Sequence, residues 1–382
     1  MDQATFLQTK KLSSVAIEAI PALVWNWWQE DKAFGIGYYP ESKSVKISHC
    51  EPDQLIELKS VDELIDLQSD YGFAVFPFNL ELNRAFFIPN YDENLLPNEL
   101  QTEGNKRNQL KPDTGLGTQD SYFQKQVAEA VSAIRNNQFS KLVLSRNAVY
   151  NFDNLDIKSL VGSLFEHYSN AHIIIFNLPG NGLWISASPE ILVQQVGKNL
   201  MKTVALAGTM AFHGQELKGQ GWTEKEIEEQ ALVSRFIKTS LKKVNFHLYE
   251  EKGPATVQAG NLLHLRTDFL VHSADVEDFG RLADELHPTS AVCGSPKNEA
   301  FEWLAKHEDF DREYFSGCAG PIEPLESKLV VLLRSGKITR QQITLYAGAG
   351  ITSASDPLKE WEETEEKLKT LLAFTSNSKA IA

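Results

Sequence analysis

Apolar and polar residues alternate along much of the chain, and this alternation predicts β-strands. Residues 71–78 and 84–90 show it, and from residue 141 onward it occurs in KLVLSRNAVY, AHIIIFNL, GLWISAS, EILVQQV, KLVVLLRSGKI and QQITLYAG. Residues 178–182 and 196–199 predict hairpin loops, and residues 335–337 predict a tighter turn. Connections this short favour antiparallel sheets.

Apolar residues that recur every three or four positions predict helices. Helices are expected at residues 61–68, 121–137, about 222–245, 297–307 and 359–373. The polar residues 102–120 are rich in turn formers and predict a linker. Because runs of strands and runs of helices are segregated, the predicted fold class is α+β and not a doubly wound sheet.

Composition and charge narrow the functional classes. Of the 382 residues, 42% are hydrophobic, enough for a large core. The net charge is 37 − 51 = −14, which argues against a nucleic-acid partner. The first residues lack an apolar signal segment, and no apolar run approaches the length of a membrane span. We therefore expect a soluble cytoplasmic protein with no membrane partner, and its three cysteines, without metal-binding spacing, are expected to be reduced.

A lysine, Lys141, opens the apolar strand KLVLSR. One interpretation places its ammonium in water at the strand edge, where most lysines lie. The other places it in a pocket, where it takes part in chemistry. The strand by itself favours the first interpretation.

Carboxylates recur at helical spacing in two predicted helices. Glu226 and Glu229 are three residues apart, and so are Glu360 and Glu363, so each pair shares a helix face. Like charges at this spacing repel, and Mg²⁺, which prefers oxygen ligands, would remove the repulsion. Acidic helix faces are more often simply solvated, and spacing does not show whether the two pairs face each other.

Other residues are candidates for a pocket, each with a plainer interpretation. Gly208, Thr209 and Gly350 either let a ligand approach the backbone or only form turns. Arg334 ends a very apolar strand, so its guanidinium needs a substrate carboxylate or an internal acid as partner.

Two titratable residues are also open to both interpretations. Glu190 follows a proline at the start of a strand; half-buried, it could have a raised pKa and act as an acid, although most such residues are exposed. His264 lies among apolar residues, where a histidine is more often structural than catalytic.

Nine segments, taken in order, resemble the chorismate-binding family. They are KLVLSR, SASPE, ALAGT, EKEIEEQALV, LLHLRT, LHPTSAVCGSP, FDREYFSGCAGPI, AGAGI and SDPLKEWEETEEK, and they span about residues 120–373. The family contains isochorismate, salicylate, anthranilate and aminodeoxychorismate synthases. The resemblance implies large, mainly antiparallel sheets packed face to face with helices outside. It implies a variable part of the same fold at residues 1–112 and a catalytic core at 118–376, together one domain. The sequence does not reveal the oligomeric state, and a monomer is the default expectation.

The resemblance also implies roles for the candidate residues. The family's water-adding members have a lysine where Lys141 stands, whereas anthranilate synthases usually have glutamine. The implied reaction is the Mg²⁺-dependent isomerisation of chorismate to isochorismate, in which water adds at C2 and the C4 hydroxyl leaves. Lys141 would be the base, with its pKa lowered, and Glu190 the acid, with its pKa raised. The implied metal ligands are Glu226, Glu229, Glu360 and Glu363, and the implied substrate contacts are Gly208, Thr209, His264, Arg334, Gly350 and Lys367.

The sequence departs from the family pattern at four positions. Glu313 replaces a common Gly, Phe315 a common Tyr, Gln230 a common His and Cys293 a common Gly. A salicylate synthase, which also eliminates pyruvate, shares the lysine and is the alternative enzyme, and a non-catalytic relic is the alternative outside catalysis. Isochorismate serves menaquinone, siderophore and salicylate biosynthesis, and the sequence does not choose among these pathways.

Overall fold

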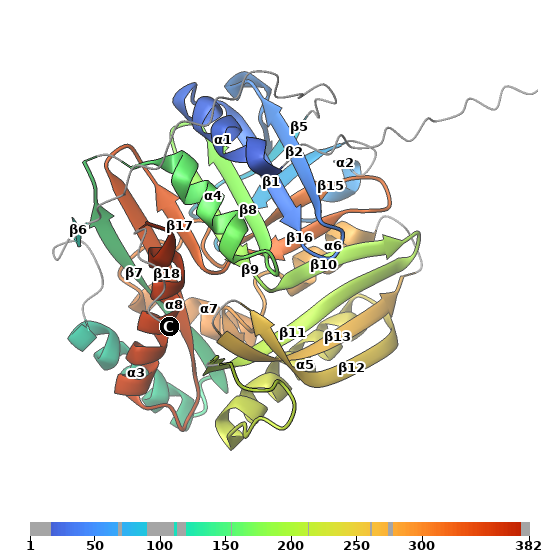
Figure 1. The fold of residues 1–382 in the computed structure, drawn as a ribbon. Helices are drawn as coiled ribbons and strands as arrows, with labels where there is room; N and C mark the ends of the chain where they lie inside the picture. Colours follow the sequence, from blue (N-terminus) through green and yellow to red (C-terminus); the bar gives the residue numbers. More distant parts are fainter. Residues whose placement is uncertain are drawn as a thin grey trace, which may run out of the picture.

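The computed structural model describes residues 17–67, 71–89, 111–112, 120–153, 155–212, 214–259, 262–273 and 278–375. In these residues two nine-stranded sheets pack face to face, and helices cover their outer faces (Figure 1). Neighbouring strands pair antiparallel throughout both sheets, as in β7 with β18 and β11 with β13. The predicted α+β class and antiparallel sheets are confirmed.

In the first sheet, eight strands follow one another in a single order, and a ninth strand, β6, pairs with β7 outside that order. The order is β14 (Gly294–Ser295), β7 (Lys141–Asn151), β18 (Gln342–Ile351), β17 (Ser335–Ile338), β9 (Gly182–Ser188), β8 (His172–Leu178), β1 (Ala33–Tyr39) and β2 (Ser44–Cys50), and β6 (Lys111–Pro112) pairs with β7. Strand β6 lies inside the predicted linker 102–120, most of which is outside the described residues.

The second sheet contains the other nine strands. Their order is β12 (His247–Ala259), β13 (Leu262–His272), β11 (Leu200–Ala211), β10 (Ile191–Gly197), β16 (Lys328–Val331), β15 (Cys318–Ile322), β4 (Gly72–Phe76), β5 (Ala85–Pro89) and β3 (Ile56–Leu58). The N-terminal residues therefore contribute strands to both sheets.

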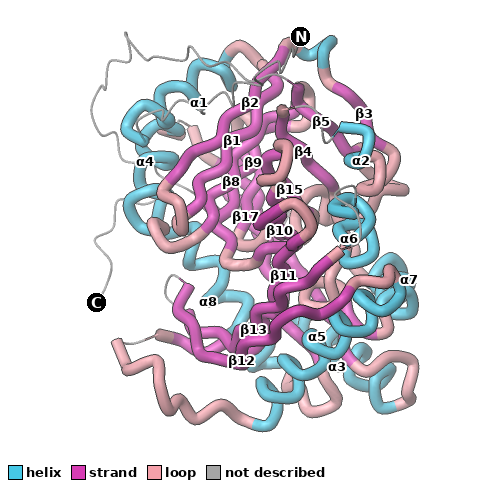
Figure 2. The backbone as a smooth tube through the Cα atoms, turned by 90° about the vertical axis from the view of Figure 1, so that its right-hand side faces the viewer, coloured by secondary structure: helices cyan, strands magenta, loops and turns pink. Residues whose placement is uncertain are grey.

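Helices cover the outer face of each sheet, and α1 and α4 lie on the opposite side from α2 and α6 in Figure 2. The first sheet is covered by α1 (Ile20–Gln29), α3 (Asp120–Arg135), α4 (Ile157–His167), α7 (Lys297–His307) and α8 (Pro357–Thr375). The second is covered by α2 (Leu64–Leu67), α5 (Glu224–Lys243) and α6 (Asp278–Leu286). Among the described residues, no helix is long and apolar enough to cross a membrane.

Between the sheets lies a third, aromatic-rich core. Phe73, Val75 and Val330 of the second sheet pack there against Phe176 and Trp184 of the first. Burial of apolar surface between the sheets and under the covering helices is the main stabilising term of the fold. Cys50, Cys293 and Cys318 are buried free thiols.

The predicted tight turn at residues 335–337 is wrong. Ser335–Ile338 is strand β17, which pairs with β9 on one side and β18 on the other. Strand β16 belongs to the second sheet, so the chain crosses between sheets just before β17, with Arg334 at a φ of 47°. The Ser–Gly pair at residues 335–336 is typical of turns and suggested a hairpin, but both residues pair within β17.

A second crossover runs beside the first. Between β9 and β10 the chain also passes from the first sheet to the second, at Glu190. The backbone N–H of Val331 donates to the carbonyl of Glu190 over 3.0 Å, and that of Ala187 donates to the carbonyl of Arg334 over 3.2 Å. These bonds hold Glu190 and Arg334 at neighbouring points between the sheets.

Candidate functional site

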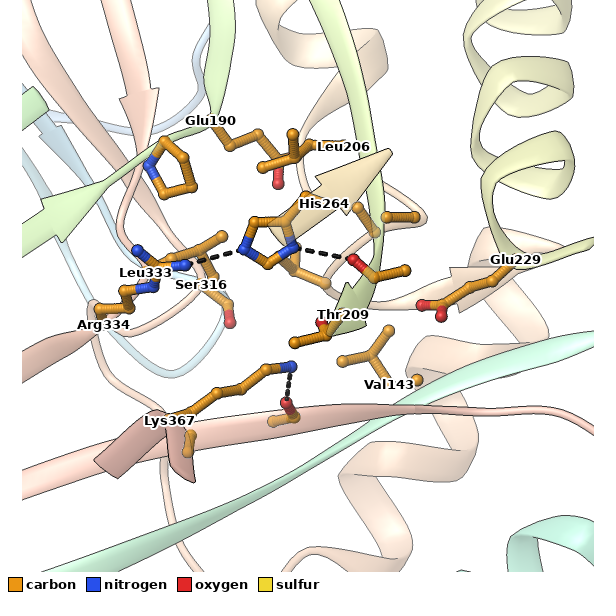
Figure 3. Close-up of a pocket in the computed structure, with 18 of the residues that line it drawn as sticks. Val143, Glu190, Leu206, Thr209, Glu229, His264, Ser316, Leu333, Arg334 and Lys367 are labelled. Atoms are coloured by element: carbon orange, nitrogen blue, oxygen red, sulfur yellow. Dashed lines mark hydrogen bonds between the residues drawn. The ribbon is translucent and has the colours of Figure 1, made fainter. Parts of the chain in front are cut away.

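A pocket opens at these crossovers, and its lining comes from both sheets and from helices α5 and α8 (Figure 3). Charged side chains, backbone groups and apolar side chains converge on it, a lining that suits a small polar molecule. Eight of the twelve predicted site residues line it: Glu190, Gly208, Thr209, Glu229, His264, Arg334, Gly350 and Lys367.

Lys141 lies behind the pocket wall and not in water. Its side chain is 0% exposed, and its Nζ is 3.1 Å from Oε1 of the pocket residue Glu229. Strand alternation puts Lys141 on the same face of β7 as Val143, which lines the pocket. The solvent-edge interpretation is therefore wrong.

Arg146, at the other end of the same strand segment, has a structural environment. It lies on the opposite face of β7, where its Nε donates to Thr364 Oγ1 over 2.6 Å. Its guanidinium stacks on Trp361 at 3.8 Å and pairs with Glu365. These contacts attach helix α8 to the first sheet.

Glu190 is a buried carboxyl group at the pocket. Burial raises the pKa of Glu190 to about 8, although a hydrogen bond from Thr289 and the charge of Lys141 both act to lower it. The Thr289 hydroxyl donates to Glu190 Oε1 over 3.3 Å. Thr289 was not predicted; its position in LHPTSAVCGSP was visible in the sequence, but nothing there paired it with an acid 99 residues away.

The pKa of Glu229 is shifted in the opposite direction to that of Glu190. Burial would raise the pKa of Glu229, but the contact with Lys141, together with the charges of Lys225 and Lys367, lowers it below its ordinary value. A carboxyl group that is protonated near neutral pH and a carboxylate that is ionised therefore share one pocket.

The acidic faces of α5 and α8 adjoin. Lys225 on α5 reaches across to Glu360 on α8, with 2.5 Å between Nζ and Oε1. Burial, and then the charge of Glu363, raise the pKa of Glu360. Glu363 itself pairs with Lys367 over 2.8 Å.

Glu226 differs from the other three acids because its carboxylate caps helix α5. It accepts from the backbone N–H of Thr223 over 3.0 Å and from the Thr223 hydroxyl, a capping box. Within the described ranges, no three metal-ligating side chains are gathered closely enough to hold an ion as they stand.

The donor set still fits Mg²⁺. Glu229, Glu360 and Glu363 supply only carboxylate oxygens, which Mg²⁺ prefers. They come from helices α5 and α8, and Glu229 lines the pocket. Oε2 of Glu360 is buried without a well-formed hydrogen bond, although the Ser355 hydroxyl lies near enough to act on its pKa. Binding a metal requires these carboxylates to exchange lysine partners for the ion.

His264 and Arg334 form a buried pair. Nη2 of Arg334 donates to Nε2 of His264 over 2.8 Å, so the other ring nitrogen carries the proton and donates to the carbonyl of Gly208, also over 2.8 Å (Figure 3). Burial and the neighbouring guanidinium lower the pKa of His264 to about 3. His264 is therefore neutral and holds the guanidinium in place.

Arg334 keeps its positive charge without an acid. Burial lowers the pKa of Arg334 to about 10, so it remains a cation at neutral pH. Its other hydrogen bond goes to the carbonyl of Ala259. Within the part of the chain that the structure describes, no carboxylate pairs with it, and a buried unpaired cation facing a pocket is suited to bind an anion.

The glycines make room at the pocket wall. A Cβ at Gly350 would lie 2.2 Å from Oε1 of Glu229, so only glycine lets this carboxylate pack there. Gly208 has a φ of 71° and sits with Thr209 at an irregularity in the pairing of β11 with β13. Nζ of Lys367 donates to the carbonyl of Gly348 over 2.8 Å.

Two departures from the family pattern lie next to the pocket. Glu313, at the common glycine, has a φ of 48°, a conformation that favours glycine, and its carboxylate pairs with Lys337 over 2.7 Å. Phe315 lines the pocket and stacks on Tyr346 at 5.4 Å. Phe315 therefore gives the pocket an aromatic ring but not the hydroxyl group that a tyrosine would supply.

The other two departures are buried in the scaffold. Gln230 donates through Nε2 to the carbonyl of Ala205 and to Thr267 Oγ1, over 3.2 and 3.1 Å. Cys293 is fully buried, with Sγ 3.7 Å from the carbonyl of Lys297. Both side chains take part in packing and not in the pocket lining.

Comparison with known proteins gives the family. The family model described as "Chorismate binding enzyme" matches residues 88–376. The chain belongs to the chorismate-binding enzyme family. The match covers the pocket and all nine segments that suggested the resemblance.

Individual members of the chorismate-binding family are moderately similar. Isochorismate synthase EntC of Escherichia coli is 32% identical over 258 residues, which are 65% of this chain and 66% of EntC, just under two thirds of its length. The vibriobactin-specific isochorismate synthase of Vibrio cholerae is 28% identical over 310 residues, 79% and 78% of the two chains.

Solved structures share the fold. MenF, the menaquinone-specific isochorismate synthase of Escherichia coli, has a TM-score of 0.77 at 20% identity, over 96% of this chain and 92% of MenF. A putative 2,3-dihydroxybenzoate-specific isochorismate synthase, DhbC of Bacillus anthracis, has a TM-score of 0.73 at 23% identity, over 92% and 99%. At these identities the likeness concerns the fold alone.

Proposed function

We propose that this protein is an isochorismate synthase, which isomerises chorismate by adding water at C2 with loss of the C4 hydroxyl. The observation that carries this proposal is a buried carboxyl group that lines the pocket, that of Glu190, with the buried amine of Lys141 behind the pocket wall. The names of the similar curated proteins support the choice of reaction.

Glu190 acts as the general acid. With a pKa of about 8 it carries a proton at neutral pH, and it gives that proton to the C4 hydroxyl, which leaves as water. The proton on the attacking water passes to Lys141. One water is consumed and one released, so the product is an isomer of the substrate.

Lys141 acts as the general base. It must be uncharged to accept a proton, so its contact with Glu229 must loosen in the working site. Mg²⁺ held by Glu229, Glu360 and Glu363 would neutralise the ring carboxylate of chorismate when bound. Glu226 would have to leave its helix cap to join these ligands.

Arg334 holds the enolpyruvyl carboxylate. Its guanidinium is buried without an acid partner in the described residues, and a carboxylate would supply one through a paired hydrogen bond. Lys367 and the backbone at Gly350 border the same space, and His264, Gly208 and Thr209 line the ring.

The test is a product assay with chorismate and Mg²⁺. Isochorismate as the accumulating product is expected. Salicylate with pyruvate, formed without a second enzyme, would contradict the proposal and favour salicylate synthase. A calorimetric titration in which neither chorismate nor Mg²⁺ binds would favour a non-catalytic relic.

A further inference from the structure

Each of the three carboxylates that fit the metal is paired with a lysine. The pairs and their distances are Glu229 with Lys141 at 3.1 Å, Glu363 with Lys367 at 2.8 Å, and Glu360 with Lys225 at 2.5 Å. The negative charge that a divalent cation would balance is thus balanced by ammonium groups of the chain itself.

Lys225 differs from the other two lysines. Lys141 is the proposed base, and Lys367 borders the substrate pocket. Lys225 does not line the pocket and has no step in the proposed reaction. Its hydrogen-bond partner is Glu360 on the other helix, which is 1% exposed, whereas Lys225 is 23% exposed.

The ammonium group of Lys225 lies between helix α5, to which it belongs, and helix α8, where it contacts Glu360. It interacts electrostatically with Glu360, then with Glu363 and Glu229, the same three acids that fit the metal. A buried carboxylate left without a counter-charge is costly, so Glu360 needs Lys225 when no metal is bound. Two cations at this place would repel each other, so the ammonium and a divalent ion compete.

We propose that Lys225 is a built-in counter-ion of the metal site, which pairs with Glu360 in the metal-free protein and is displaced when a divalent cation binds. This inference rests on the metal site of the proposed function. Because Lys225 must leave, it lowers the affinity of the site for the metal. Because it links α5 to α8, it stabilises the metal-free protein.

The first experiment compares Mg²⁺ binding by calorimetry in the wild type and in Lys225→Met. The variant is expected to bind Mg²⁺ roughly tenfold more tightly, because a competing positive charge is gone. In EDTA the variant is expected to melt at a lower temperature, and its melting temperature should rise more on Mg²⁺ addition. Lys369→Met is the matched control, since it removes the same charge from an exposed pair with Glu366 on α8.

A second measurement does not depend on that variant folding. Lysines of the wild type are reductively methylated with a ¹³C label, and the Lys225 signal is assigned by its loss in Lys225→Arg. Addition of Mg²⁺ is expected to shift this signal while the Lys369 signal stays in place.

The outcomes separate the two proposals. Suppose that the wild type binds Mg²⁺ and that Lys225→Met binds it equally or more weakly, or that the Lys225 signal does not shift when Mg²⁺ binds. Either result overturns the counter-ion role and leaves the proposed metal site unaffected. Wild-type protein that binds no Mg²⁺, with or without chorismate, overturns both.

Discussion

Nζ of Lys141 lies 3.1 Å from Oε1 of Glu229; the lysine side chain is 0% exposed and the glutamate side chain 14%. The base proposed for water activation and a carboxylate proposed for the metal thus share a contact. Loosening this contact would free the carboxylate for the proposed metal and the amine for the proposed base role at once.

Replacing Lys141 tests the proposed base. Lys141→Met is expected to lower kcat for isochorismate formation at least ~100-fold, because the proposed acceptor for the proton of the attacking water is gone. Chorismate affinity should change little, since Arg334 remains. Product chromatography and a binding titration measure the two effects. Lys306→Met, an exposed lysine on α7, is the control. Water addition at near wild-type rate in Lys141→Met would show that another group is the base.

Thr289 should tune the proposed acid. Its hydrogen bond lowers the pKa of Glu190, so Thr289→Val is expected to raise that pKa further above 8. The rate requires protonated Glu190, so the fall of the rate at alkaline pH should move to higher pH in this variant. Thr289→Ser keeps the hydroxyl and should restore the wild-type profile. An unchanged profile in Thr289→Val would assign the alkaline limb to a different group.

The free energy of unfolding should depend on pH through the ionisation of Glu190. Its pKa is raised from 4.5 to about 8 on folding, so its stabilising contribution is complete below pH 4.5 and is lost as pH rises through 8. Glu190→Gln is neutral at all pH values. The free energy of unfolding of the wild type should therefore fall relative to Glu190→Gln between pH 5 and pH 9. Urea denaturation at several pH values measures the difference, and a constant difference would mean that Glu190 is ionised in the folded protein.

Arg334 should govern substrate affinity. Arg334→Lys is expected to raise KM for chorismate ~10-fold or more, because an ammonium cannot form the paired hydrogen bonds of a guanidinium. Arg334→Met should also raise the pKa of His264 from about 3, since burial remains but the neighbouring charge is gone. NMR titration of the histidine ring follows this shift. A KM that stays constant in Arg334→Lys would place the substrate carboxylate elsewhere.

Two glycine substitutions should have opposite effects. In Gly350→Ala the new Cβ would lie 2.2 Å from Oε1 of Glu229, so Mg²⁺ binding and activity should both fall.

In Gly162→Ala, on helix α4, the new Cβ would contact only the Pro21 side chain, at 3.9 Å, and the variant should be more stable than the wild type by ~0.5–1 kcal/mol. Calorimetry and thermal melts compare them; Gly350→Ala with wild-type Mg²⁺ affinity would remove Glu229 from the ligand set.

Local pattern determined much of the fold. Alternating residues and short loops predicted the β8–β9 and β10–β11 hairpins, because exposure along a strand repeats every two residues. Helical periodicity likewise predicted α3, α5, α7 and α8. The spacing of Glu360 and Glu363 placed both acids on one helix face, since that depends only on the helix itself.

Tertiary structure decided what depends on distant partners. Lys141 meets Glu229 88 residues later, and Thr289 meets Glu190 across 99 residues, contacts that no local periodicity encodes. Glu226 has the same spacing signal as Glu360, yet its neighbour Thr223 engages it in a helix cap. The sequence therefore identified which residues could form the site. The packing of the two sheets with helices α5 and α8 determined which of these residues meet, because side chains far apart in the chain come into contact only when the whole chain has folded.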